Sequence, residues 1–211
     1  MLETLSYAGA ALSLLVAAAC ESWSRLREPA RQHLVLGAVL AVACLWAMRA
    51  GIGPGLSLHL SAATLLALTL GWPLALLVLA GACLGLGLTG LVPWPVLGLD
   101  YLTSGVVPVA VSWWVLRLSE RWLAPHLFVY LFVCAFFGSA LAVVAGALCR
   151  AGMLLTLALP EAWRLGPDFL LLLPLIALPE ALLNGFVMTG FVIMRPEWVR
   201  TYDDRRYLGS P

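Results

Sequence analysis

The sequence predicts an all-α integral membrane protein, a bundle of about seven transmembrane helices. Of its 211 residues, 63% are hydrophobic and only 11% are charged, and the mean hydropathy is +0.99. Soluble domains contain about 45–50% apolar residues, so this chain has too few polar residues to cover a soluble surface. The apolar residues also form runs that suit membrane-crossing helices. We therefore expect contact with the lipid bilayer, in a bacterial inner membrane.

One membrane domain over residues 1–211 accounts for all the candidate spans, and no soluble domain interrupts them. The spans are Leu5–Cys20, Leu34–Met48, His59–Leu70, Pro73–Leu91, Leu102–Leu116, Phe128–Leu148 and Phe169–Met194. Several are shorter than the roughly 20 residues that cross a bilayer core, so we expect them to borrow flanking residues or to be shielded inside the bundle. The sequence Gly71, Trp72, Pro73 predicts a tight turn between two helices.

Arginine placement predicts the orientation. Nine arginines fall in connections on one side of the predicted topology, namely Arg25, Arg27, Arg31, Arg117, Arg121, Arg195, Arg200, Arg205 and Arg206. Three fall on the other side, namely Arg49, Arg150 and Arg164. Because basic residues concentrate in cytoplasmic loops, we expect the N-terminus outside and the C-terminus in the cytoplasm.

The sequence contains no lysine, since all 12 basic residues are arginine. A Walker A loop needs a lysine on the nucleotide phosphates, so this chain does not hydrolyse ATP by that route. A retinal Schiff base needs lysine as well. No HExxH or GxSxG motif and no spaced pair of carboxylates is present, and we expect no enzyme activity. A net charge of +1 gives no reason to expect nucleic-acid binding.

Glu180 is the most informative polar residue, because it lies near the middle of a long apolar run with Asn184 one helical turn later. An ionisable group at that depth costs about 2.5–3.5 kcal/mol unless it faces protein or water. Two interpretations stay open: Glu180 handles a proton or an ion, or the two side chains form a structural pair, with Glu180 protonated or bridged to hydroxyl groups across the bundle.

His59 follows a turn at Pro54 and Gly55 on the expected outer side, with Ser57 and Ser61 beside it. Neutral imidazole is a common ligand of transition metals, so His59 is a candidate metal ligand; an interfacial hydrogen-bonding role is the alternative. Asp100 is expected on the same side, just before the Leu102 span. It either caps that helix or supplies an oxygen ligand or an entry charge.

Three segments together resemble the membrane permease of energy-coupling-factor transporters for cobalt and nickel, the CbiM and NikM type. They are GPGLSLHLSAATLLALTLGWPLALLVLAG, LGLDYLTSGVVPVAVSWWVL and LPEALLNGFVMTGFVIMRPEWV. The matching positions are Gly55, Ser57, His59, Glu180, Arg195, Pro196 and Glu197, whereas Asp100 stands where the family usually has asparagine. The resemblance implies a CbiM-like core over residues 34–199, preceded by a first span and cytoplasmic connection (1–33) and followed by a cytoplasmic tail (200–211).

The resemblance implies import of a transition-metal ion, with a separate ATPase and a coupling protein on the cytoplasmic face and no permanently bound cofactor. In that family the N-terminal amine, a histidine at position two and the histidine of the outer turn hold the metal. Only the last is matched here, as His59, because the chain begins Met1, Leu2, Glu3. Two alternatives stay open: a non-transporting scaffold or assembly subunit that keeps the fold, and a permease for a small organic solute with Glu180 as a proton relay.

Overall fold

Long apolar helices form most of the computed structural model, which describes residues 2–53, 56–156 and 167–208. Two of them are single α-helices in the first quarter of the chain, α1 (Leu2–Cys20) and α2 (Pro29–Ala47), and a third is α9 (Pro167–Met194). Two more are composite. In the described ranges, five helices are long and apolar enough to cross a membrane, which confirms the predicted class of fold.

Each composite helix contains a π-helical segment. The first joins α5 (Trp94–Tyr101), the π segment η2 (Leu102–Val106) and α6 (Val107–Trp122). The second joins α7 (Leu127–Val129), the π segment η3 (Tyr130–Phe137) and α8 (Gly138–Thr156). Segments of this kind are rare and often lie near functional sites. The first composite helix begins at Trp94, eight residues before the predicted start at Leu102.

The shortest helix within the bundle is α3 (Ala63–Leu70), whose eight residues are about 12 Å long. The predicted span His59–Leu70 is therefore only partly helical, and it does not cross a bilayer by itself. Helix α4 (Trp72–Leu88) follows at once. Gly71 makes the predicted tight turn at φ 86°, where a Cβ atom would also lie 2.9 Å from Nη1 of Arg200.

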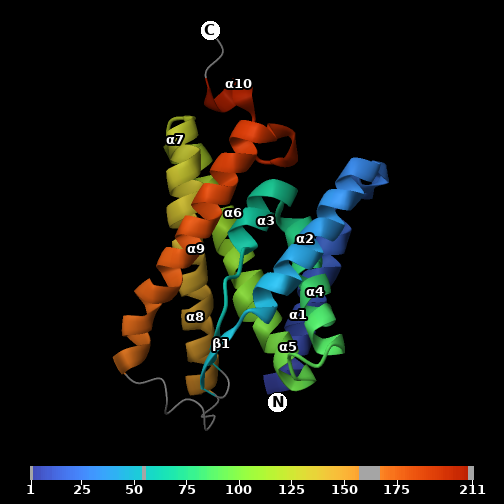
Figure 1. The fold of residues 1–211 in the computed structure, drawn as a ribbon, viewed down its shortest axis with the longest axis vertical. Coiled ribbons are helices and arrows are strands. Elements are labelled where there is room, and N and C mark those ends of the chain that lie inside the picture. Colours follow the sequence, from blue (N-terminus) through green and yellow to red (C-terminus); the bar gives the residue numbers. More distant parts are fainter. Residues whose placement is uncertain (1, 54–55, 157–166, 209–211) are drawn as a thin grey trace.

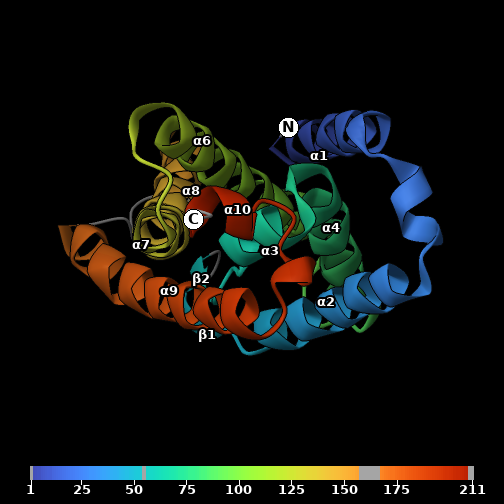
Figure 2. The same ribbon diagram turned by 90° about the horizontal axis from the view of Figure 1, so that it is seen from above.

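Helix α3 lies at the centre of the molecule (Figures 1 and 2). Helix α4 packs against it on one side and is itself in contact with α1 and α2, while α6, α8 and α9 contact α3 on the other side. Its apolar side chains enter two separate buried clusters, Leu66 and Leu70 in the first and Leu68 in the second. This short helix therefore joins the two halves of the bundle.

The C-terminal tail completes the last turn of α3. The backbone amides of Arg200 and Thr201 donate to the carbonyl oxygens of Thr69 and Leu68, at 2.9 and 3.3 Å. The Arg200 guanidinium donates to the Leu70 carbonyl at 3.0 Å and forms an ion pair with the fully buried side chain of Glu21 at 3.1 Å. Carbonyl groups at the end of a helix have no partner within it, and here the tail supplies one.

A short antiparallel hairpin follows α2, which the sequence did not predict. Strand β1 (Ala50–Gly53) pairs with β2 (Leu56–Leu58), with Ala50 opposite Leu58 and Gly51 opposite Ser57. Runs of four and three residues are too short to show the alternation by which strands are usually recognised.

The connections between helices lie at two opposite ends of the bundle. Figure 1 shows the α1–α2 connection, the start of α7 and the C-terminal helix α10 (Asp204–Tyr207) at one end, and the N-terminus and the hairpin at the other. The first end also holds two short 3₁₀ helices, η1 (Trp23–Arg27) and η5 (Pro196–Trp198). This arrangement agrees with the predicted grouping of the connections, while the assignment of one end to the cytoplasm stays a prediction.

Candidate functional site

Glu180 lies on α9 with its side chain fully enclosed, at 1% exposure. Its two carboxylate oxygens accept hydrogen bonds from successive backbone amides, Oε2 from Ser61 at 2.7 Å and Oε1 from Ala62 at 2.8 Å. Two neighbouring N–H groups directed at one anion form a common anion-binding arrangement of the backbone. The carboxylate therefore holds the chain just before α3.

Asn184 extends the same arrangement by one turn of α9. Its Nδ2 donates to Glu180 Oε1 at 2.9 Å, and its Oδ1 accepts from the Leu65 amide at 2.8 Å. The first amides of a helix have no partner within it, and a carboxylate is favourable at the positive end of the helix dipole. Glu180 and Asn184 thus cap α3 from another helix. The predicted pair is present, but its partners are backbone amides rather than hydroxyl groups.

The four residues between β2 and α3, 59–62, form a non-helical segment that is held from several directions. Besides Glu180, Trp46 Nε1 donates to the Ser61 carbonyl at 3.1 Å, and Ser61 Oγ donates to the Ser104 carbonyl at 2.6 Å. Ala62 has a left-handed φ of 53°. For a residue other than glycine that conformation costs about 1–3 kcal/mol and persists only where the surroundings impose it.

His59 is the first residue of this segment and is half-buried. Its ring lies edge-on to the Trp46 ring, with the centroids 5.0 Å apart and an interplanar angle of 65°. Ser57 precedes it in β2, where only the backbone is described. The structure therefore joins Ser61 to Glu180, and it places His59 two residues before Ser61, against the Trp46 ring.

Asp100 forms the centre of a second cluster. It is 1% exposed and lies inside the composite helix rather than ahead of it, so it does not cap a helix start as predicted. Its Oδ2 accepts from Arg49 Nη1 at 2.9 Å, and its Oδ1 accepts from Arg150 Nη1. Thr103 Oγ1 is 3.4 Å from the same Arg150 nitrogen. Asp100 tolerates this depth because two guanidinium groups surround it.

The sequence analysis missed Arg49 and Arg150 as site residues, because both adjoin apolar runs and were assigned to outer connections. Their side chains are only 18% and 10% exposed. A buried carboxylate needs a compensating charge. Asp100 was therefore the one feature of the sequence that could have indicated buried arginine partners. Arg49 also joins the two clusters, because its Nε donates to the Trp46 carbonyl at 2.9 Å.

Few side chains here are suited to bind a metal ion. Among the described residues, no three His, Cys, Asp or Glu side chains come together as a possible metal site. His59 supplies one imidazole, while the oxygens of Asp100 and Glu180 already accept hydrogen bonds from protein donors. Met1 lies outside the described residues.

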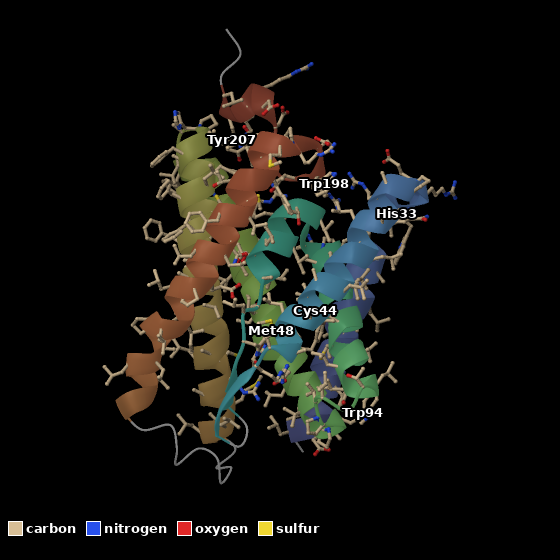
Figure 3. The ribbon with its side chains drawn as sticks, in the orientation of Figure 1. His33, Cys44, Met48, Trp94, Trp198 and Tyr207 are labelled. Atoms are coloured by element: carbon tan, nitrogen blue, oxygen red, sulfur yellow. The ribbon has the colours of Figure 1, made fainter. Side chains whose placement is uncertain are left out.

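An apolar cavity of about 600 Å³ lies between α2, α3 and α9. Its lining includes Ala38, Leu66 and Val187, and it extends to His33 and Trp198. Figure 3 shows these last two near the end of the bundle that carries the C-terminus. Apart from His33 and Thr69 the lining is almost entirely hydrocarbon, so this cavity is poorly suited to bind a cation.

Comparison with known families decides the relationship. The family model for CbiM, the cobalt uptake substrate-specific transmembrane region, matches residues 2–198. The chain belongs to the CbiM family. The match extends from the start of α1 to the end of η5. The CbiM fold here therefore includes the polar groups around Glu180, those around Asp100, and the short central helix α3.

A solved structure described as a truncated transition metal transporter is similar to this CbiM-family chain. The TM-score is 0.68, the alignment covers 90% of this chain and 92% of the other, and 18% of the residues are identical. At that identity the likeness shows a common fold. Comparison with curated protein sequences gives no match.

Proposed function

We propose that the chain is the membrane permease of an energy-coupling-factor transporter that imports a transition-metal cation. The observation that carries the proposal is the family match over residues 2–198, because the description of that family is the substrate-specific transmembrane region for cobalt uptake. The cation is the cargo, and His59 is its first protein ligand. Nickel and cobalt both fit an imidazole ligand, since affinity for nitrogen donors is high for both metals.

The geometry around His59 supports this assignment. Ser61 and Ala62 are fixed by Glu180, Trp46 and the Ser104 carbonyl. A ligand binds best when its surroundings hold it in position before the metal arrives. In this proposal Glu180 and Asn184 are positioning residues, which hold the segment that carries His59.

Energy comes from a separate ATPase with its coupling protein, because the chain has no lysine for a Walker A loop. We place the docking face at the arginine-rich end. A pocket of about 560 Å³ is present there, lined by the α3–α4 turn, the end of α6 and the tail, including Trp113, Arg117, Glu120, Arg200 and Arg206. Helix α3 ends in this pocket, so a partner bound there is connected through α3 to the segment that holds His59.

A second candidate is a non-transporting scaffold that keeps the fold. The observation in its favour is that no group of three possible metal-binding side chains occurs among the described residues.

Metal accumulation in cells tests the proposal. We expect cells with the wild-type chain and its ATPase partners to accumulate labelled nickel or cobalt, and His59→Ala to abolish most of that accumulation. The reason is that the metal loses its one imidazole ligand while the bundle keeps its packing. Scintillation counting of washed cells and immunoblotting of membranes measure uptake and protein level.

His33→Ala is the matched control, since it removes an exposed imidazole near the opposite end of the bundle. It should leave uptake unchanged. Equal uptake by wild type and His59→Ala at equal protein level contradicts the metal site, and wild-type uptake no higher than in cells without the protein favours the scaffold.

A further inference from the structure

The apolar cavity of about 600 Å³ between α2, α3 and α9 has no part in the proposed function. Helix α3 forms its floor, and α2 and α9 form its two walls. Among its described lining residues, the polar groups are the side chains of His33 and Thr69 and the indole N–H of Trp198. Thr69 Oγ1 donates to the Leu65 carbonyl at 2.7 Å, so the interior of the cavity presents hydrocarbon to its occupant.

The walls of this cavity continue into the lipid-facing surface of the bundle. Leu36 and Leu40 adjoin lining residues of α2 in the sequence, Phe186 adjoins one of α9, and all three side chains are exposed. Both helices are long and apolar enough to cross a membrane. An apolar hollow on such a surface is filled from the membrane, because water gains nothing from a hydrocarbon lining.

The length of the cavity matches one leaflet of a bilayer. Its lining along α2 extends from Ala30 to Leu45, about 22 Å along the helix axis. A bilayer with its head groups is about 40–45 Å thick, so one leaflet measures roughly half of that. The cavity begins at the arginine-rich end, near His33 and Trp198 (Figure 3), and ends at Leu45. A partner helix that crosses the membrane would need a groove through both leaflets, whereas a phospholipid needs only one.

The end of the cavity at Trp198 is basic. The guanidinium carbon of Arg195 lies 5.8 Å from the centroid of the Trp198 ring. The ion pair of Arg195 with Glu197 is 3.5 Å long, and its two side chains are 62% and 59% exposed. Such a pair contributes little, so the guanidinium is available to a phosphate oxygen. Tryptophan is typical of the head-group level, which is where a phosphate would lie.

We propose that a phospholipid with a negatively charged head group occupies this cavity. One acyl chain packs on α3 between α2 and α9, and the phosphate accepts a hydrogen bond from Arg195. Basic sites between transmembrane helices on the cytoplasmic side bind anionic lipids, and the arginine-rich end is the predicted cytoplasmic end. The inference goes beyond the proposed function and does not depend on it, because it concerns how α3 is packed rather than what is transported.

Native mass spectrometry of the purified full-length chain in detergent tests the inference by counting bound lipids. The probes are phosphatidylglycerol and phosphatidylcholine with the same acyl chains, the second having no net charge. We expect one phosphatidylglycerol to stay bound to each chain, with an affinity about fivefold higher than that of phosphatidylcholine, the contribution of one arginine at a membrane surface. Equal affinities for the two lipids would rule out the anionic head group.

Gly37→Phe tests the place of the acyl chain. Gly37 lines the cavity, and a Cβ atom on it would have no neighbouring atom within 4 Å. The phenylalanine ring should therefore enter the cavity and abolish retention of both lipids. Gly190→Phe on α9 is the matched control, since a Cβ atom there is equally free but Gly190 is not a lining residue. Equal lipid retention by the two variants overturns the inference.

Arg195→Gln tests the place of the head group and should lower the affinity for phosphatidylglycerol about fivefold. Arg117→Gln is the control, because it removes an equally exposed charge at the same end of the bundle. Melting temperatures report whether the variants fold, and if Gly37→Phe does not, the arginine pair decides. An unchanged affinity in Arg195→Gln contradicts the inference. A wild-type chain that is a dimer without bound lipid, and that Gly37→Phe makes monomeric, would assign the cavity to a second copy instead.

Discussion

Glu180 shows how one residue can be conspicuous in a sequence for a reason that the sequence does not reveal. An acid within an apolar run predicted either ion handling or a structural pair. In the structure its carboxylate caps the start of α3. Its partners could not be predicted, because they are backbone amides of Ser61 and Ala62. The side chains of residues 59–62 do not mark this stretch as non-helical, so the sequence did not show that its backbone amides need an acceptor.

Glu180→Gln should destabilise the protein by about 2 kcal/mol. The glutamine side chain has one oxygen and one NH₂ group, so one of the two backbone N–H groups that now donate to the carboxylate would face another donor. The midpoint of unfolding in mixed micelles measures the loss. Glu197→Gln serves as control, since Glu197 is 59% exposed and 3.5 Å from its arginine partner. A midpoint equal to that of the control would mean that Glu180 does not cap α3.

Asp100→Asn should cost about 3–5 kcal/mol, because two buried guanidinium groups lose their counter-charge. The same unfolding measurement applies. Adding Arg150→Met should restore part of the loss, since the more exposed Arg49 can then turn toward water. If the double variant is no more stable than Asp100→Asn, uncompensated guanidinium charge is not the cause of the loss.

At the scale of elements, the apolar runs predicted most helices and the sequence Gly71, Trp72, Pro73 predicted the turn between α3 and α4. The start of the first composite helix and the hairpin are among the features that were missed. The first composite helix begins at Trp94 because Asp100, which looked like a helix cap, is neutralised within the helix. The hairpin was missed because its strands are very short. Both depend on contacts with distant residues, which local patterns do not contain.

Close packing of α8 against η2 depends on one glycine. A Cβ atom on Gly146 would clash with the carbonyl oxygen of Thr103. A Cβ atom on Gly152 of the same helix would have no neighbouring atom within 4 Å. Gly146→Ala should therefore lower the free energy of unfolding by about 1–3 kcal/mol through overpacking. Gly152→Ala should be neutral or stabilising by up to about 1 kcal/mol. Equal midpoints for the two variants would contradict this packing.

For the whole molecule, the predicted orientation still rests on the arginine count. Arg49 and Arg150, two of the three arginines counted on the outer side, form ion pairs with Asp100; Arg49 lies in the connection between α2 and β1, and Arg150 lies within α8. Nine arginines are counted at the end that carries α10, and the assignment of that end to the cytoplasm stays a prediction.

Cysteine labelling checks this orientation. In a chain whose five cysteines are replaced by alanine, Leu91→Cys and Leu208→Cys introduce thiols at opposite ends, both at positions that are 59% exposed. An impermeant maleimide should label Leu91→Cys in intact cells and Leu208→Cys only after lysis. The reverse pattern would invert the topology and move the proposed docking face outside.

Helix α3 also sets a constraint on the order of synthesis. The amides just before α3 bind Glu180, an amide in its first turn binds Asn184, and carbonyls of its last turn accept from Arg200 and Thr201. All four of these residues leave the ribosome long after α3 itself. Unpaired backbone groups are not stable in lipid. A nascent chain that ends before α9 therefore cannot bury α3, and the centre of the protein is the last part to assemble.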